Sequence, residues 1–273
     1  MRGFLIFMLV LTVVEVIFYL ALPTLLRLRG IDAKRVGPFG LRLVFETEDE
    51  DGTPVRLVNV NGTFQSATYL SDELWSELVC VYHRQMVEVI NAMGDARSVL
   101  VIGGGGYSLP KYLVTHTRRM RMCVVEIDPA MTELARERFF LDRAESAADG
   151  RLELVSGDGF AWLESCEQRF DVIVNDAFSA GKPLKKLATE DGARLIANHL
   201  TERGVYLANI RCPLEGPRAG VVPVVKAAFG TAFAHVRMIA ENPEEPRRLG
   251  NNVLVATNRA LGDELGRVFA DRA

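Results

Sequence analysis

Three acidic residues each stand at or just after the end of a short apolar run. Glu126 and Asp176 end two of these runs, and Asp158 follows a third. In open α/β sheets, ligands bind in the crevice outside the carboxyl ends of the strands, so we expect the three carboxylates to meet there. Glu126 follows Gly105 by about 20 residues, a spacing typical of a carboxylate that binds ribose hydroxyls. A capping or surface role for Glu126 and a turn role for Asp158 are the alternatives.

A run of four glycines follows the apolar run that ends at Ile102. Glycines let a backbone approach a ligand closely at the start of a helix, which is typical of a nucleotide-binding loop. A tight strand-to-helix turn without a ligand is the alternative. The dinucleotide pattern GxGxxG would need glycine at the position of Ser108, so a nicotinamide or flavin site is less well supported. We expect Gly103, Gly104 and Gly105 to contact the ligand.

The elements that must position these residues alternate between short apolar strands and helices, the pattern of a parallel, doubly wound sheet. Two more strands, at residues 235–239 and 252–257, are expected to add an antiparallel edge. The predicted fold over residues 71–260 is therefore a Rossmann-like α/β domain, followed by a tail or helix at residues 261–273. The parallel strands are expected at residues 98–102, 122–126, 152–156, 172–176 and 205–210.

Two hairpin signals precede this domain. An acidic turn at residues 47–52 separates two apolar segments, and Asn61-Gly62 is a strong signal for a tight hairpin turn. Residues 38–70 are therefore expected to form a small β-hairpin domain. Residues 72–93 carry apolar side chains at nearly helical spacing, which predicts a helix packed beside the sheet.

The amino-terminal segment from Phe4 to Leu26 is almost continuously apolar. A helix of this length is sufficient to cross a hydrocarbon core of about 30 Å. More basic residues follow the segment than precede it, which predicts that the rest of the chain is cytoplasmic. Residues 1–30 are therefore predicted to be a hydrophobic helix that acts as a single anchor at the cytoplasmic face of a membrane. A signal peptide, a buried core helix and a soluble cytoplasmic protein are the alternatives.

The overall charge and the scattered metal-binding residue types exclude two classes of partner. The formal net charge of −3 shows no basic excess of the kind that nucleic-acid binding requires. The four cysteines and four histidines lack the spacing of a metal site. We therefore expect neither a nucleic acid nor a metal.

The successive segments VLVIGGGG, VVEID, SGDGFAWL and FDVIVNDAF resemble the motifs of the spermidine synthase (polyamine aminopropyltransferase) family, which has the class I methyltransferase fold. VNVNGTFQSATYLSDE resembles that family's amino-terminal hairpin. The resemblance implies that Gln65, Glu126 and Asp158 contact the nucleoside, Glu126 at the ribose and Asp158 near the adenine amino group. It also implies that Asp176 accepts the proton of an attacking amine, and Gly159 completes the expected nucleotide site.

The sequence departs from the family's pattern at three places. Gly106 stands where the glycine loop usually has an aspartate, Ser179 where a second acid falls, and residues 75–77 where a tyrosine and a glutamine are expected. An aspartate at position 106 would repel the carboxylate of S-adenosylmethionine, and a glycine would not. Both decarboxylated S-adenosylmethionine and S-adenosylmethionine itself are therefore candidate donors.

The predicted function is a spermidine synthase-like transfer of an aminopropyl or related group from an adenosyl sulfonium donor to a small-molecule amine. A methyltransferase that uses S-adenosylmethionine and a non-catalytic nucleotide-binding module are the alternatives, because a fold does not determine a function. Whether the chain forms a homo-oligomer is left open.

Overall fold

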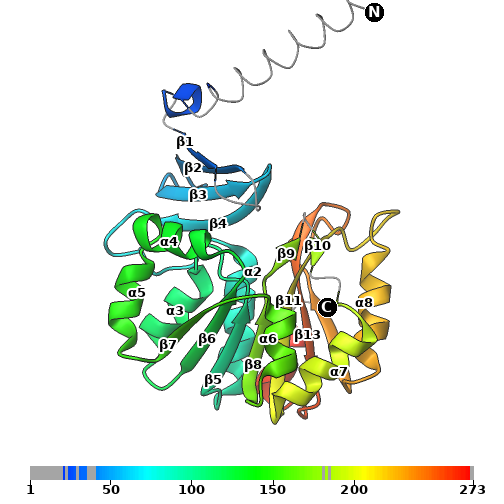
Figure 1. Cartoon of the computed structure of the whole chain (residues 1–273). Helices are drawn as coiled ribbons and strands as arrows, with labels where there is room; N and C mark the ends of the chain where they lie inside the picture. Colours follow the sequence, from blue (N-terminus) through cyan, green and yellow to red (C-terminus); the bar gives the residue numbers. More distant parts are fainter. Residues whose placement is uncertain are drawn as a thin grey trace, which may run out of the picture.

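The small amino-terminal sheet and a larger α/β part are the two components of the fold (Figure 1). They are seen in a computed structural model that describes residues 21, 24–28, 31–35, 41–179, 182–183 and 186–270. The small sheet is antiparallel, as predicted, and its strands follow the order β1-β2-β3-β4. Its members are β1 (Asp32–Arg35), β2 (Leu41–Glu48), β3 (Pro54–Val60) and β4 (Thr63–Tyr69).

The turn between β3 and β4 has the backbone that its sequence predicts. Asn61 and Gly62 both have positive φ angles, 51° and 80°. Asparagine and glycine tolerate this left-handed region better than other residues, and tight hairpin turns require it. The Asn-Gly signal therefore identified a real hairpin.

The large sheet of the described chain has seven strands in the order β12-β13-β11-β8-β5-β6-β7. The five strands from β11 to β7 pair in parallel, whereas β13 is antiparallel to both β11 and β12. The predicted mostly parallel sheet with an antiparallel edge is therefore confirmed. The strands are β5 (Ser98–Ile102), β6 (Arg121–Glu126), β7 (Leu152–Ser156), β8 (Phe170–Asn175), β11 (Leu200–Cys212), β12 (His235–Ile239) and β13 (Gly250–Thr257). The short strands β9 (Phe178–Ser179) and β10 (Lys182–Pro183) form a separate pair.

Helices cover both faces of this sheet. One core cluster includes residues of α2 (Val81–Met93), α3 (Ser108–His116), α4 (Pro129–Arg138), α5 (Leu141–Ala148) and α9 (Asp263–Ala270). The other includes residues of α6 (Gly159–Ser165), α7 (Glu190–His199) and α8 (Val221–Gly230). Strand β5 contributes Val99 and Val101 to the first cluster and Leu100 and Ile102 to the second. Because both faces are buried, the central strands are continuous apolar runs in the sequence.

The helix predicted over residues 72–93 begins later than expected. α2 starts at Val81, and residues 72–76 form turns. The Trp75 carbonyl accepts hydrogen bonds from the Lys111 ammonium of α3 and from the Thr68 hydroxyl of β4. These contacts with other elements replace the helix that local periodicity predicts, because propensity is a weak preference that tertiary context overrides.

The predicted anchor from Phe4 to Leu26 lies almost entirely outside the described residues. Among the residues that the structure does describe, no helix is long and apolar enough to cross a membrane. The prediction of a single membrane anchor, and of a location at the cytoplasmic face of a membrane, is therefore wrong.

Candidate functional site

A cavity of about 780 Å³ opens at the carboxyl ends of β5, β6, β7 and β8. Residues of β4 line its other side, and the small sheet lies over this end of the large sheet (Figure 1). This is the place where open α/β sheets bind ligands. The structure brings together every residue predicted for the site: Gln65, Gly103, Gly104, Gly105, Glu126, Asp158, Gly159 and Asp176 all line the cavity.

Gly103 brings the glycine loop against the end of β8. Its φ is +91°, and a Cβ atom at this position would lie 2.8 Å from both the Cα and the backbone nitrogen of Ala177. A residue with a side chain would therefore be strained and would also collide with the neighbouring backbone. Without a side chain, the loop packs directly beside Asp176, whose amide donates a hydrogen bond to the Ile102 carbonyl at 2.9 Å.

Glu126 is held against the glycine loop by three backbone amides. The amides of Gly104 and Gly105 donate to Oε2 at 2.7 and 3.1 Å, and the amide of Asp128 donates to Oε1 at 2.9 Å. Glu126 is only 7% exposed. The carboxylate is therefore oriented by the protein at the position that the sequence predicts for a ribose contact.

Asp158 forms the amino-terminal cap of α6. Its Oδ1 accepts hydrogen bonds from the amides of Phe160 and Ala161, at 3.0 and 2.9 Å. The next residue, Gly159, lets α6 approach β5, because a Cβ there would collide with the Ile102 side chain. Both hydrogen bonds end on Oδ1, so the capping of α6 does not use the second oxygen of Asp158, a residue that lines the cavity.

Asp176 is held by three side chains that sequence reasoning did not identify. Oδ2 accepts a hydrogen bond from the Tyr82 hydroxyl at 3.1 Å and lies 2.8 Å from His83 Nε2. Oδ1 accepts from the Asn209 side-chain amide at 3.0 Å. The Asp176 side chain is 15% exposed, so it is sheltered and still borders the cavity. Its position and orientation are therefore determined from two elements, α2 and β11.

The Tyr82 hydroxyl stays protonated and donates a hydrogen bond to the Asp176 carboxylate. Burial raises the pKa of Tyr82 well above its usual value of 10, and the negative charge of Asp176 raises it further. Residues 75–77 lack the tyrosine that the family resemblance implies there, and the tyrosine that contacts Asp176 is instead the second residue of α2. The late start of this helix concealed the signal.

Position 106 was expected to face the donor, but Gly106 is not among the residues that line the cavity. A Cβ on Gly106 would lie 2.6 Å from Ser66 Oγ and 3.1 Å from the Phe139 ring. Ser66 is itself buried and lies 3.0 Å from Ser108, oxygen to oxygen. The glycine thus allows close packing between the loop and β4, and an aspartate at position 106 would need a different arrangement of β4.

A buried ion pair joins the small sheet to the site. Arg42 of β2 donates to the carboxylate of Asp128, which lines the cavity and caps α4. Arg42 is only 1% exposed. A buried guanidinium without a partner is strongly unfavourable, so this pair fixes where the two parts meet. The lining also contains a basic residue, Lys186, whose ammonium lies 4.8 Å from the centre of the Phe160 ring.

No group of three or more acidic, cysteine or histidine side chains within the described ranges is arranged to hold a metal ion.

The fold, the glycine loop and the acids at successive strand ends together define a Rossmann-like α/β protein of the type shared by spermidine synthases and methyltransferases. The sequence pattern of the Spermine/spermidine synthase domain matches residues 79–240, more than half of the chain. The chain therefore belongs to the spermine/spermidine synthase family, as its motifs predicted.

Curated proteins similar to this chain are named polyamine aminopropyltransferases. A polyamine aminopropyltransferase of Pectobacterium atrosepticum is 32% identical over 129 residues, which are 47% of this chain and 45% of that protein. A polyamine aminopropyltransferase of Ruegeria sp. is 28% identical over 195 residues, 70% of this chain and 69% of that protein. The match thus spans about half of the Pectobacterium protein and rather more of the Ruegeria one.

Solved structures support the fold. A probable spermidine synthase from Corynebacterium glutamicum superimposes with a TM-score of 0.68 at 23% identity, over 83% of this chain and 82% of that one. Human methyltransferase-like protein 13, in complex with SAH, gives a TM-score of 0.56 at 21% identity, over 70% of this chain and 90% of that one. At these identities the likeness is one of fold alone, and function has to be argued from the site.

Proposed function

We propose that this chain transfers an aminopropyl group from decarboxylated S-adenosylmethionine to a small-molecule amine. One observation carries the proposal: Asp176, held by Tyr82, His83 and Asn209, borders the same cavity as Glu126 and Asp158. A nucleoside-binding set and an oriented carboxylate in one cavity are what such a transfer requires. The names of the curated relatives support the same class of reaction.

The proposed step is a substitution at the carbon beside a sulfonium. The nitrogen of the acceptor forms a bond to this carbon while the carbon–sulfur bond breaks, and the sulfur leaves as the neutral thioether of methylthioadenosine. The amine attacks only as the free base, so a carboxylate that orients it and takes its proton accelerates the reaction. Asp176 has this role in the proposal, and its three partners keep its oxygens in place before the acceptor arrives.

The remaining residues of the cavity bind the donor in this proposal. Glu126 accepts hydrogen bonds from the ribose hydroxyls and Asp158 from the adenine amino group. Gly103 and Gly105 provide backbone surface with no side chain in the way. Gln65, on β4, contacts the nucleoside from the side of the small sheet.

The charge of the cavity favours the decarboxylated donor. Acidic side chains outnumber basic ones in the lining, and the basic Lys186 lies at the Phe160 ring. An additional carboxylate on the donor would be repelled by these acids, whereas the ammonium of the decarboxylated form would be attracted. The acidic members are Glu126, Asp158 and Asp176, together with Asp128, whose charge is paired with Arg42.

One feature of the glycine loop favours a second candidate, methyl transfer from S-adenosylmethionine. Gly106 supplies no negative charge near the loop, so a donor that keeps its carboxylate meets less repulsion there than an aspartate would cause. The chemistry differs only in which carbon of the sulfonium is attacked. The two reactions leave different nucleoside products.

The test incubates the protein with each donor and a panel of diamines and identifies the nucleoside product. Methylthioadenosine from the decarboxylated donor is the expected result. S-adenosylhomocysteine from S-adenosylmethionine would replace the proposal with the methyl transfer, and calorimetric donor binding without any product would indicate a non-catalytic nucleotide-binding module. Calorimetry with both donors also measures the preference for the decarboxylated form, which is expected to bind at least about tenfold more tightly.

A further inference from the structure

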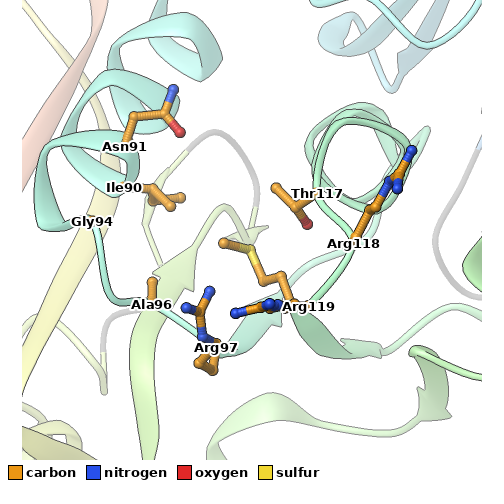
Figure 2. A pocket seen from close by; sticks show the side chains of 9 residues that line it. Ile90, Asn91, Gly94, Ala96, Arg97, Thr117, Arg118 and Arg119 are labelled. Carbon is orange, nitrogen blue, oxygen red and sulfur yellow. The ribbon is translucent and has the colours of Figure 1, made fainter.

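A second pocket lies at the other end of the parallel strands, at their amino ends, away from the glycine loop. It has a volume of about 390 Å³ and lies between the carboxyl ends of α2 and α3 and the amino ends of β5 and β6 (Figure 2). Its polar lining consists of three arginines, an amide and a hydroxyl, and we call it the arginine pocket. These polar residues are Arg97, Arg118, Arg119, Asn91 and Thr117.

Two of the arginines face one another. Figure 2 shows the guanidinium groups of Arg97 and Arg119 turned toward each other across the pocket, with that of Arg118 directed away. In the described part of the chain, neither of the two facing groups has a side-chain hydrogen bond or ion pair, and the pocket lining contains no acidic residue. Two facing positive charges repel each other, and an anion between them would turn this repulsion into attraction.

These arginines are not needed to satisfy the helix ends beside them. At the end of α3, Arg151 donates to the carbonyls of Val114 and Thr117, at 2.9 and 2.8 Å. At the end of α2, Arg259 donates to the Met93 carbonyl at 2.9 Å. These three carbonyl groups, of the kind that attracts basic residues to helix carboxyl ends, are therefore already occupied.

Two acids close to Arg97 are also engaged elsewhere, one near it along the chain and one at its backbone amide. Asp95 forms ion pairs with Arg259 and Arg203, at 2.7 and 3.2 Å. Asp171 accepts a hydrogen bond from the backbone amide of Arg97 at 2.8 Å, which holds the strand end and leaves the guanidinium of that residue free. Within the described chain, the facing pair thus has excess positive charge without an internal partner.

We infer that the arginine pocket binds a phosphate-bearing anion. A guanidinium presents its N–H groups in a planar fork that matches two phosphate oxygens, and two forks can neutralise a doubly charged group. Asn91 adds a neutral amide donor at the same pocket, whereas the Thr117 hydroxyl already donates to the Leu113 carbonyl at 2.7 Å. The pocket is separate from the adenosyl cavity, so this inference is independent of the proposed transfer.

The test is calorimetric titration of the full chain with pyrophosphate, in phosphate-free buffer at low salt. Saturable binding with a Kd of about 1 mM or tighter is expected, and it should weaken as salt is added. Arg97→Gln and Arg119→Gln should each weaken binding at least about tenfold. Arg237→Gln makes the same charge change at an exposed residue of β12, at the far edge of the sheet, and should leave the affinity unchanged.

Three results would overturn the inference. The first is no saturable binding of either pyrophosphate or anionic vesicles, and the second is equal binding by the wild type and both pocket variants. The third is loss of pyrophosphate binding when an adenosyl donor fills the other cavity, because pyrophosphate would then bind in that cavity. Arg119→Lys keeps the charge and should retain part of the affinity, which separates a loss of charge from a loss of fold. Thermal unfolding of each variant, measured in parallel, reports on the fold directly.

A second arm identifies where the phosphate comes from. Sedimentation compares vesicles of phosphatidylcholine alone with vesicles that also contain phosphatidylglycerol. Retention that requires phosphatidylglycerol and both arginines would assign the pocket to a lipid headgroup. Pyrophosphate binding without retention would assign it to a free phosphate compound, and either result supports the phosphate site.

Discussion

The two ends of the parallel strands carry opposite charges, and we call them the carboxyl edge and the amino edge of the large sheet. The charged groups at the first have hydrogen-bond partners in the protein, and the guanidinium groups of the two facing arginines at the second have none among the described residues. At the carboxyl edge, Glu126, Asp158 and Asp176 all accept hydrogen bonds from protein donors. At the amino edge, Arg97 and Arg119 face each other, and the described chain gives neither guanidinium a partner. Hydrogen bonds already in place orient a group before its substrate arrives, as catalysis requires. Unpaired exposed charges have no such orientation, which is compatible with binding but not with a positioned reaction.

Asp176→Asn is expected to have the largest effect. An amide cannot take the proton of the acceptor amine, so turnover should fall by about 10²-fold or more. The Kd of the donor should change little, because Asp176 is not among the residues proposed to hold the nucleoside. Product release and donor calorimetry measure the two quantities. Asp149→Asn is the control, at an exposed residue whose φ of 47° asparagine tolerates, and unchanged turnover in Asp176→Asn would exclude the proposed role.

Gly103→Ala is expected to have the next largest effect. The new methyl group would collide with the Ala177 backbone at a φ of +91°, so the loop must move and the fold should lose about 1–3 kcal/mol. Donor affinity should fall at least about tenfold. Gly157→Ala is a matched control, because Gly157 lines the same cavity and a Cβ there would meet nothing within 4 Å. Equal effects of the two substitutions on donor affinity would contradict the packing argument.

Lys111 differs in burial from the charged residues that border the two pockets, because its side chain is completely buried. Its ammonium donates to the Thr68 hydroxyl and to the carbonyls of Trp75 and Phe139. Burial lowers the pKa of Lys111 from 10.5 to about 7. Between these two pH values the unfolded chain binds more protons than the folded one, so this residue makes stability rise with pH.

The variant Lys111→Met removes this contribution. Between pH 7 and 8.5, the free energy of unfolding of the wild type should rise by about 1.5 kcal/mol relative to the variant. Urea denaturation at a series of pH values measures the difference. Below pH 6 the difference between the two proteins should be constant. Parallel curves across the whole range would show that the folded-state pKa of Lys111 is not lowered.

Tyr82→Phe tests whether the hydrogen bonds of Asp176 matter for its role. Loss of one donor to a carboxylate should lower turnover about tenfold, because such a bond contributes about 1.5 kcal/mol or more, and donor affinity should not change. Tyr206→Phe is the matched control. Tyr206 is also buried, and its hydroxyl accepts a hydrogen bond from Asn175, away from the Asp176 carboxylate. Equal turnover of the two variants would assign Tyr82 to packing alone.

The smallest effect is expected at the amino edge. Arg119→Gln removes one of two facing positive charges, so the protein without ligand should gain about 0.3 kcal/mol of stability at low salt. The gain should disappear near 1 M salt, where charges are screened over about 3 Å. Thermal unfolding at both salt concentrations measures it. A loss of stability at low salt would mean that Arg119 has a stabilising partner in the fold.

Much of the fold and of the cavity could be predicted because the signals were local. The acids at strand ends and the glycine run lie directly after their strands, so identifying the strands also placed Glu126 and Asp176. The partners of Asp176 could not be predicted in this way. Tyr82 and His83 lie in a helix more than ninety residues earlier, and their apolar neighbours made them look like ordinary core residues. Asn209 comes 33 residues after Asp176 and lies within the buried strand β11.

By itself, the sequence determined the order of the strands along the chain, the glycine loop and the acidic residues that follow the strands. These features depend on backbone conformations that neighbouring residues set. The tertiary structure alone decided which side chains hold Asp176, where α2 begins, and that Arg97 and Arg119 face each other. Hydrogen bonds and charge contacts between distant segments depend on how the elements pack, and spacing along the chain does not encode that packing.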